Sequence, residues 1–436
     1  GDIDVDGTTN LDVVDIDGAV NMASTLAVAG VVTVSDGSAS APSITNVGDT
    51  NSGLYFPADD NVGLVIGGSR KLLANSSGVT INNGDLTLPD GTDLITGSAG
   101  TSNFRAGVNA GNSIVSGGNY NVVVGDEAGT AITTGDGNVA VGYTSLQATT
   151  TGTLNAGLGH QALYTNTTGT NNTGVGTYAL YANTTASNNT AVGMNALTAN
   201  TTGTNNVALG ALALDANTTA NNNTALGMSS LTSNTTGSEN TAAGVSSLGA
   251  NTTAANGTAF GYNSLGANTT GASNTAVGRS ALAANTTGTA NTASGYGALH
   301  DNTTGASNVA IGNEAMQNNT TASFNVAVGV DALYTNTTGA SNTAVGEAAL
   351  DANTTASNNT AVGRDALGAN TTGVQNTAVG SLAGDAITTG NNNVAVGYSS
   401  LGATTTAAQN VAVGVTALAA NTTAANNTAI GYNALT

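Results

Sequence analysis

The chain has 436 residues, of which 60 are glycine, and only 7% are charged, far below the ~25% of ordinary soluble domains. There is no cysteine, which excludes disulfides, zinc-thiolate sites and thiol catalysis. The net charge of −20, without any basic patch, makes nucleic acid and anionic membranes poor partners.

Residues 1–42 are predicted to form an acidic β-stem of short strands. Apolar and polar residues alternate there, and Asp-Gly pairs such as Asp17-Gly18 mark turns. The segment Asp2-Ile-Asp-Val-Asp-Gly7 also begins like a calcium-binding EF-hand loop. However, Val13 stands where that loop needs glutamate, and no helical pattern flanks it. We therefore interpret this segment as a turn and expect no metal site.

Residues 43–102 are predicted to form a small β section. Three short strands separated by glycine turns fit the segments from Gly48 to Pro57, Gly67 to Leu73 and Ser76 to Ile81. The aromatic pair Tyr55 and Phe56 is expected to form a small core rather than a ligand cage.

Residues 103–120 resemble one irregular unit, because Gly107 lies eighteen residues before Gly125. From residue 121 to 436 a glycine then recurs every seventeen residues, on a grid that includes Gly125, Gly142, Gly278 and Gly431. Self-similarity at a fixed period is the signature of stacked repeats. The sequence predicts an all-β, fibrous parallel β-solenoid or β-roll of seventeen-residue coils.

We number the positions of each unit from its first residue, so that Asn274 is position 1 and Gly278 is position 5. Positions 2 to 4 are small or β-branched, which favours a short strand. The glycine at position 5 and the small residue at position 15 each favour a turn. We expect two short strands and two turns per coil, and a rod of roughly 90 Å at ~4.8 Å per coil.

Two columns are predicted to share the interior of the solenoid. Position 9 is usually leucine, as in Leu265, Leu282 and Leu299. In two units position 9 is glycine, and position 12 is then Ile132 or Ile387 in place of the usual asparagine. Because volume lost from a close-packed interior must be refilled, the two positions should reach the same space. The asparagine column should then face inward, where stacked amides satisfy one another.

So thin a coil encloses little apolar volume, so we predict an intertwined homotrimer whose chains share one core. No apolar run reaches the ~18 residues of a membrane span, so membrane insertion is not expected. The chain starts inside a patterned segment and stops inside a repeat. We therefore expect both ends to be truncated.

The chain resembles tailed-phage fibre proteins, especially marine ones, in two places. One is the segment Gly48-Asp-Thr-Asn-Ser-Gly-Leu-Tyr-Phe-Pro57, followed by Gly-Gly and Ser-Ser-Gly-Val-Thr-Ile. The other is the repeat Asn-Thr-Ala-Val-Gly-x-x-Ala-Leu-x-x-Asn-Thr-Thr-Gly. This repeat is also similar to Asn-Ser-Val-Ala-Ile-Gly units in the heads of trimeric autotransporter adhesins. The resemblance implies trimeric β-rolls and a place on a particle or cell surface.

Catalytic residues and cofactors are not expected. The two histidines, His160 and His300, occupy variable positions in different coils, and the acids of the repeat are scattered singly. No base is spaced to activate the many serines and threonines. We therefore predict that the protein is not an enzyme.

Two features of the Asn-Thr-Thr segment, which fourteen units carry, invite functional interpretations. The segment matches the N-glycosylation acceptor, but the exchange of asparagine for isoleucine in two units favours an internal asparagine ladder. Its threonines also resemble the arrays of ice-binding solenoids. Since adjacent residues of a strand point to opposite faces, only one threonine per coil could lie on a flat surface.

The predicted function is that of a structural shaft of a virion tail fibre, which spaces or presents a host-receptor-binding tip. The expected partners are further copies of the chain, other virion tail proteins and a host surface glycan or receptor. Surface contacts could come from Tyr143, Tyr164, Tyr181, Tyr262 and Tyr334, which lie in variable columns without a dense cluster. The alternatives are the stalk or head of an adhesin on a bacterial cell surface, and an ice-binding solenoid.

Overall fold

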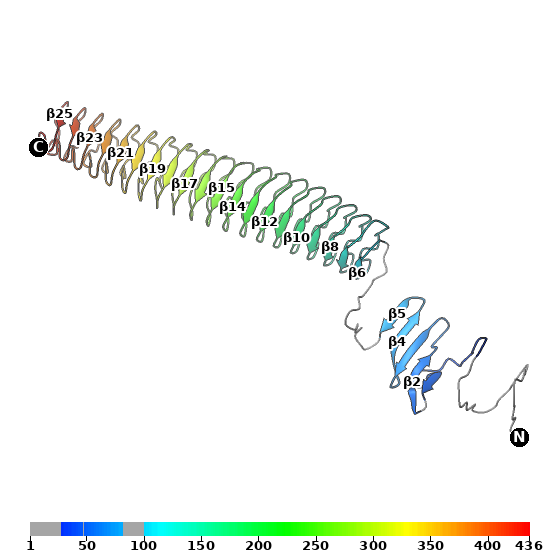
Figure 1. Cartoon of the computed structure of the whole chain (residues 1–436). Coiled ribbons are helices and arrows are strands. Elements are labelled where there is room, and N and C mark those ends of the chain that lie inside the picture. Colours follow the sequence, from blue (N-terminus) through cyan, green and yellow to red (C-terminus); the bar gives the residue numbers. More distant parts are fainter. Residues whose placement is uncertain (1–27, 47, 82–99) are drawn as a thin grey trace, which may run out of the picture. The chain divides into compact units, whose positions relative to one another are not determined.

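The computed structural model describes residues 28–46, 48–81 and 100–436. Within these ranges every regular element is a β-strand and no helix is formed. The chain divides into two units, residues 1–94 and 95–436 (Figure 1). The fold is therefore all-β, as predicted, but most of the expected acidic stem, including Asp2 to Gly7, lies outside the described residues.

The first unit contains one antiparallel sheet in the order β1-β2-β3-β4-β5. Its strands are β1 (Ile44–Asn46), β2 (Asp49–Tyr55), β3 (Val62–Ile66), β4 (Ser69–Asn75) and β5 (Gly78–Ile81). The sequence analysis expected three strands and missed β1 and β3. Gly63 interrupts the apolar pattern of β3 because the Tyr55 ring lies over it, and a Cβ there would meet the ring at 2.2 Å. Tyr55 is buried, as expected for a small core.

The second unit is a parallel β-solenoid in which each coil contributes one strand to a single ladder (Figure 1). The ladder pairs each strand with the strand of the next coil, from the β6–β7 pair to the β24–β25 pair. The strands are β6 (Phe104–Ala106), β7 (Val122–Val124), β8 (Val139–Val141), β9 (Ala156–Leu158), β10 (Thr173–Val175), β11 (Thr190–Val192), β12 (Val207–Leu209), β13 (Thr224–Leu226), β14 (Thr241–Ala243), β15 (Thr258–Phe260), β16 (Thr275–Val277), β17 (Thr292–Ser294), β18 (Val309–Ile311), β19 (Val326–Val328), β20 (Thr343–Val345), β21 (Thr360–Val362), β22 (Thr377–Val379), β23 (Val394–Val396), β24 (Val411–Val413) and β25 (Thr428–Ile430).

Each coil has one strand, at positions 2 to 4, and the predicted second strand is absent from the described coils. The reason lies in the backbone. The grid glycines at position 5 have φ between 124° and 141°, and non-glycine residues at positions 7, 9 and 17 have φ between 49° and 65°. Left-handed residues cannot extend into a strand. The chain therefore closes each coil through successive turns.

Residues 103–120 form the first coil, as predicted, because β6 pairs in parallel with β7. The main-chain N–H of Val115 donates to the carbonyl of Thr133, so Val115 corresponds to position 13. The side-chain amide of Asn103 donates to the carbonyl of Gly118, just as the amide of Asn121 donates to Gly135 at position 15, so Gly118 corresponds to position 15. The extra residue thus lies between Val115 and Gly118. It lengthens one turn and leaves the ladder intact.

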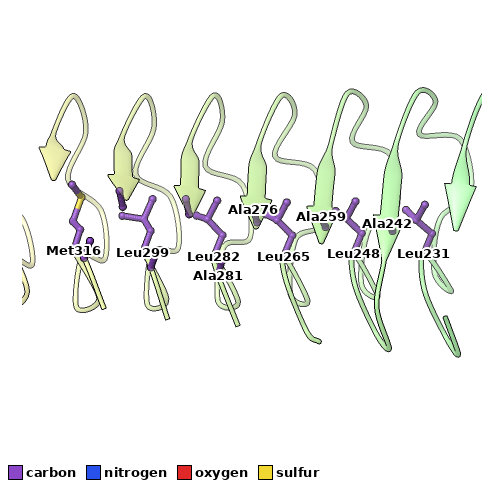
Figure 2. Packing of buried hydrophobic residues seen from close by; sticks show 14 of the residues in the cluster. Leu231, Ala242, Leu248, Ala259, Leu265, Ala276, Ala281, Leu282, Leu299 and Met316 are labelled. Carbon is purple, nitrogen blue, oxygen red and sulfur yellow. The ribbon is translucent and has the colours of Figure 1, made fainter. Parts of the chain in front are cut away.

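The core is a column of leucine side chains enclosed by one chain. Leu265, Leu282 and Leu299 are fully buried, as predicted, and Met316 takes the same place in its coil (Figure 2). Buried alanines at positions 3 and 8 surround this column. A core shared between chains is therefore not needed to bury these leucines. Each leucine has a left-handed backbone, which costs ~1–2 kcal/mol, and burial of its side chain, worth ~1.5–3 kcal/mol, offsets that cost.

Positions 9 and 12 do share interior space. A Cβ added to Gly129 would lie 2.7 Å from Cδ1 of Ile132, and one added to Gly384 would lie 3.0 Å from Cδ1 of Ile387. The isoleucine therefore occupies volume that leucine fills elsewhere. The first coil repeats this exchange, because Ile114 is buried beside Gly111.

The predicted asparagine ladder runs through the interior at position 12. Asn285 donates from Nδ2 to Oδ1 of Asn268 at 2.8 Å, and Asn302 donates to Oδ1 of Asn285 at 2.8 Å. The ladder extends from Asn166 to Asn370. It ends on either side because the neighbouring unit has another residue at position 12, Thr149 at the first end and Ile387 at the second. At the second end Ile387 offers no donor, and Oδ1 of Asn370 remains buried without a partner.

A second buried ladder at position 1 was not predicted. Oδ1 of Asn274 accepts bonds from the main-chain N (2.9 Å) and Nδ2 (3.2 Å) of Asn291, and Nδ2 of Asn274 donates to the carbonyl of Gly288 at 2.7 Å. Each amide thus joins two coils and also closes its own coil. This double role explains why position 1 is almost always asparagine.

A double-mutant cycle tests the shared volume. Leu282→Gly alone leaves a cavity and should lower the free energy of unfolding by about 2–5 kcal/mol. Asn285→Ile alone adds bulk beside the intact leucine and breaks the ladder. In the double variant the isoleucine refills the cavity, and the main remaining cost is the unpaired Oδ1 of Asn268, about 1–3 kcal/mol.

We therefore expect the double variant to melt at a higher temperature than either single variant, with a favourable coupling of at least about 1 kcal/mol. Equal losses in Leu282→Gly and in the double variant would mean that the two positions do not compensate each other.

Candidate functional site

Five aromatic side chains meet on the surface of three adjacent coils. We call Tyr143, His160, Tyr164, Tyr178 and Tyr181 the aromatic cluster. They occupy positions 6, 7 and 10, where the turns of consecutive coils lie one above the next. The sequence analysis placed Tyr143, Tyr164 and Tyr181 along the rod without a dense cluster, and that prediction was wrong.

The rings of the cluster form a continuous chain of contacts. Tyr143 stacks on His160 with centroids 5.6 Å apart, and Tyr164 stacks on Tyr181 at 5.1 Å with an interplanar angle of 4°. Tyr178 joins the two pairs, because its ring lies edge-on to His160 at 5.4 Å and to Tyr181 at 5.7 Å. Such stacked and edge-on pairs are the favoured aromatic geometries, so the rings hold one another in place.

The cluster is open to solvent. Tyr143 is 52% exposed and Tyr178 is 36% exposed, His160 is exposed, and Tyr164 and Tyr181 are half-buried. The inner rings thus anchor the patch while the outer rings present their surfaces.

Polar side chains border the cluster on the side of the preceding coils. Gln147 lies one coil before Tyr164 in the same column, and its Nε2 donates to Oε2 of Glu127 at 2.8 Å. Asp126 precedes Tyr143 in column 6. Neither lysine nor arginine occurs between Arg105 and Arg279. The site therefore combines aromatic surface with carboxylate and amide groups.

The remaining predicted tyrosines lie elsewhere. Tyr262 and Tyr296 flank Arg279 in column 6, with its guanidinium carbon 5.9 Å and 5.8 Å from the two ring centroids. Tyr334 makes no ring contact with another described residue. The structure therefore separates the five predicted tyrosines into one cluster, one cation–π group and one single residue.

Three residues of these groups, His160, Tyr178 and Tyr296, were not among the predicted contacts. The seventeen-residue period of the sequence was enough to predict these contacts. Residues seventeen apart stand in one column of a stack with a rise of ~4.8 Å, so Tyr143 must face His160 and Tyr164 must face Tyr181. The sequence analysis examined each column for variability and did not compare adjacent coils.

Within the described ranges the structure brings no unlike catalytic groups together. His160 belongs to the aromatic cluster, and Nδ1 of His300 lies 2.6 Å from Oδ1 of Asp301 in a partly exposed pair. Among the described residues, no group of three or more acids or histidines is placed to hold a metal ion. The described part of the chain also contains no helix able to cross a membrane.

Acidic side chains of neighbouring coils do interact. Burial raises the pKa of the Asp351 carboxyl, and the charges of Asp331 and Asp365 raise it further. Burial also raises the pKa of Asp385, to which Asp365 contributes as well. The charge of Asp365 thus acts on carboxyl groups of both the preceding and the following coil.

The Asn-Thr-Thr segment has a structural role in the described coils. Asn166 and the other asparagines of the ladder are buried and hydrogen-bonded, so their amides are closed to a glycosylating enzyme once the coil has folded. The first threonine donates from Oγ1 to the main chain of the next coil, as Thr286 does to Thr303 at 3.0 Å. The second, such as Thr168, is exposed. One threonine per coil is therefore exposed, as predicted, although positions 13 and 14 do not form the expected strand.

Comparisons of the chain with models of protein families, with curated proteins and with solved structures found no match.

Proposed function

We propose that the coils form the rigid shaft of an extracellular fibre, and specifically of a virion tail fibre that presents a receptor-binding tip. The observation that supports this proposal is the unbroken register of the ladder from β6 to β25. Every coil bonds the next through the same pattern of main-chain contacts, and most coils add the same asparagine contacts. A stack without a hinge resists bending, which is the mechanical requirement of a spacer.

The outer face of the ladder supports self-association. Positions 2 and 4 point away from the core, and no coil from residue 121 on carries a charge at either position. Large exposed apolar side chains at position 4 form a stripe along the rod: Val141, Leu158, Leu209, Leu226, Phe260, Val277, Ile311, Val362, Val379 and Ile430. Charged residues occupy only the other variable columns. The uncharged face is therefore a candidate contact between copies of the chain.

The size of this face approaches that of such a contact. Nineteen coils at ~4.8 Å, with two outward residues that span ~7 Å of strand, give roughly 600 Å². A stable interface buries ~800 Å² per partner, so this uncharged face, made mostly of threonine and aliphatic side chains, is somewhat smaller than one such interface. Another copy also has the same axial spacing, so its coils match in register along the whole rod. We propose three parallel copies, as in the adhesin heads that the repeat resembles.

Light scattering on the purified chain tests this assembly. The expected mass is three times the 41.8 kDa of one chain. Glutamate at three outward positions, Val277, Ile311 and Val362, should dissociate the assembly and leave each coil folded, because charges in a contact between copies would be desolvated without partners.

The matched control places the same three glutamates at position 6, at Asn313, Val330 and Ser381, where Glu347 stands naturally. This variant should keep the mass of the wild-type chain. A wild-type chain that is a stable monomer would refute the trimer and weaken the shaft proposal.

A surface adhesin is the second candidate, because the aromatic cluster gives one part of the rod a binding character that a pure spacer does not need. The ice-binding alternative has weaker support, since each coil exposes one threonine of the pair, as Thr168 illustrates. In the adhesin alternative, the same coils would form a stalk or head on a bacterial cell surface.

A further inference from the structure

We propose that the aromatic cluster is a binding site for a neutral saccharide. Sugar rings present apolar C–H surfaces that stack on aromatic faces, and hydroxyl groups that need hydrogen-bond partners. The cluster supplies the first through the solvent-exposed ring surfaces of Tyr143, His160 and Tyr178, and the second through its tyrosine hydroxyls and the amide of Gln147. The inference goes beyond a role as spacer and does not depend on it.

The rings are held in place before any ligand arrives. Each ring contacts at least one other, and Tyr178 contacts both His160 and Tyr181. Side chains that are already fixed lose little conformational entropy on binding, and tyrosine is a rigid side chain that provides large contact area. The span of two coil steps, ~10 Å, suits a short oligosaccharide.

Charge selects a neutral ligand. Asp126 and Glu127 lie at the edge of the cluster, and no lysine or arginine occurs between Arg105 and Arg279. Carboxylates accept hydrogen bonds from sugar hydroxyls but repel uronic acids, sialic acids and sulfated sugars. An acidic oligosaccharide should therefore bind more weakly than a neutral one of equal length.

The cluster also stays accessible in the proposed assembly. It occupies positions 6, 7 and 10, the columns that carry charged residues such as Asp215, Glu314 and Asp331 in other coils. Association through positions 2 and 4 would leave these columns facing solvent.

The test is titration calorimetry of the full chain with neutral hexasaccharides of glucose in α- and β-linkage and of N-acetylglucosamine, and with a hyaluronan hexasaccharide as the acidic probe. We expect saturable binding of at least one neutral probe, with a Kd of about 1 mM or tighter. Tyr178→Ala should weaken it at least about tenfold, because Tyr178 joins both stacked pairs. Ala348 shows that alanine is accepted at position 7.

Tyr398→Ala is the control, since Tyr398 is a tyrosine at position 6, 52% exposed against 36% for Tyr178, that contacts no other ring in the described coils. It should leave binding unchanged. Tyr178→Phe keeps the ring and should retain most of the affinity. The proposal is overturned if no neutral probe saturates, if Tyr178→Ala and Tyr398→Ala behave alike, or if the acidic probe binds as tightly. A change of oligomeric mass in Tyr178→Ala would instead assign the cluster to a contact between copies.

Discussion

Leu282→Asp is expected to unfold the coils around it and to lower the free energy of unfolding by about 4 kcal/mol or more. The side chain is fully buried, and its neighbours are buried alanines and the leucines of adjacent coils. None of these can pair with a carboxylate, and the amide of Asn285, which shares this interior space, already donates to Asn268 and Gly288. Melting followed by circular dichroism should show a large loss of stability.

Leu212→Asp provides the control for this substitution. Leu212 also has a left-handed backbone, with φ of 59°, but it is half-buried at position 7, where Asp331 stands naturally with φ of 55°. The same change of residue and backbone geometry should therefore cost little there. Similar melting temperatures for the two variants would contradict the assignment of position 9 to the core.

Gly278→Ala is the second change with a large expected effect, about 3–5 kcal/mol. At φ of +134° a side chain is strained, and its Cβ would lie 2.3 Å from the carbonyl oxygen of Gly295 in the next coil. Relief of that clash would require the ladder to open, because the contact is with backbone. A loss of this size should appear as a lower midpoint of chemical denaturation.

Gly288→Ala is the comparison that isolates the cause. A Cβ at Gly288 would also lie 2.3 Å from a carbonyl oxygen, that of Gly305, but the φ of Gly288 is not in the left-handed region. Other coils have alanine at this position, as at Ala254 and Ala322. We expect a loss below about 1 kcal/mol for this variant. Equal losses of stability in Gly278→Ala and Gly288→Ala would mean that the close approach of the added Cβ to the next coil, and not the value of φ, causes the destabilisation.

Much of the coil could be predicted from the sequence because a strict repeat exposes the role of each column. The exchange of leucine and asparagine for glycine and isoleucine located the interior at positions 9 and 12, and the structure buries Leu282 and Ile132 there. The first coil contains the same pair, Gly111 and Ile114. The sequence analysis missed it because the extra residue shifts this coil off the seventeen-residue spacing.

Features that depend on backbone geometry were harder to predict. Leucine at a left-handed φ has no signal in composition, so the predicted second strand was replaced by turns around Leu282 and its equivalents. The aromatic cluster depends on which columns lie side by side in space. Tyr178 and Tyr181 are three residues apart, yet their rings meet only because the turn brings positions 7 and 10 together.

Because the register of the solenoid is constant, the number of its coils could change during evolution. Between Asn166 and Asn370 each coil offers the next one the same amide donor and acceptor, so duplication or deletion of a seventeen-residue unit by recombination would preserve the contacts on both sides. The length of the rod could then change in steps of one coil, ~4.8 Å, without new folding information. Thr149 and Ile387 mark the points where this interchange ends, because neither side chain offers the next unit the amide that it needs.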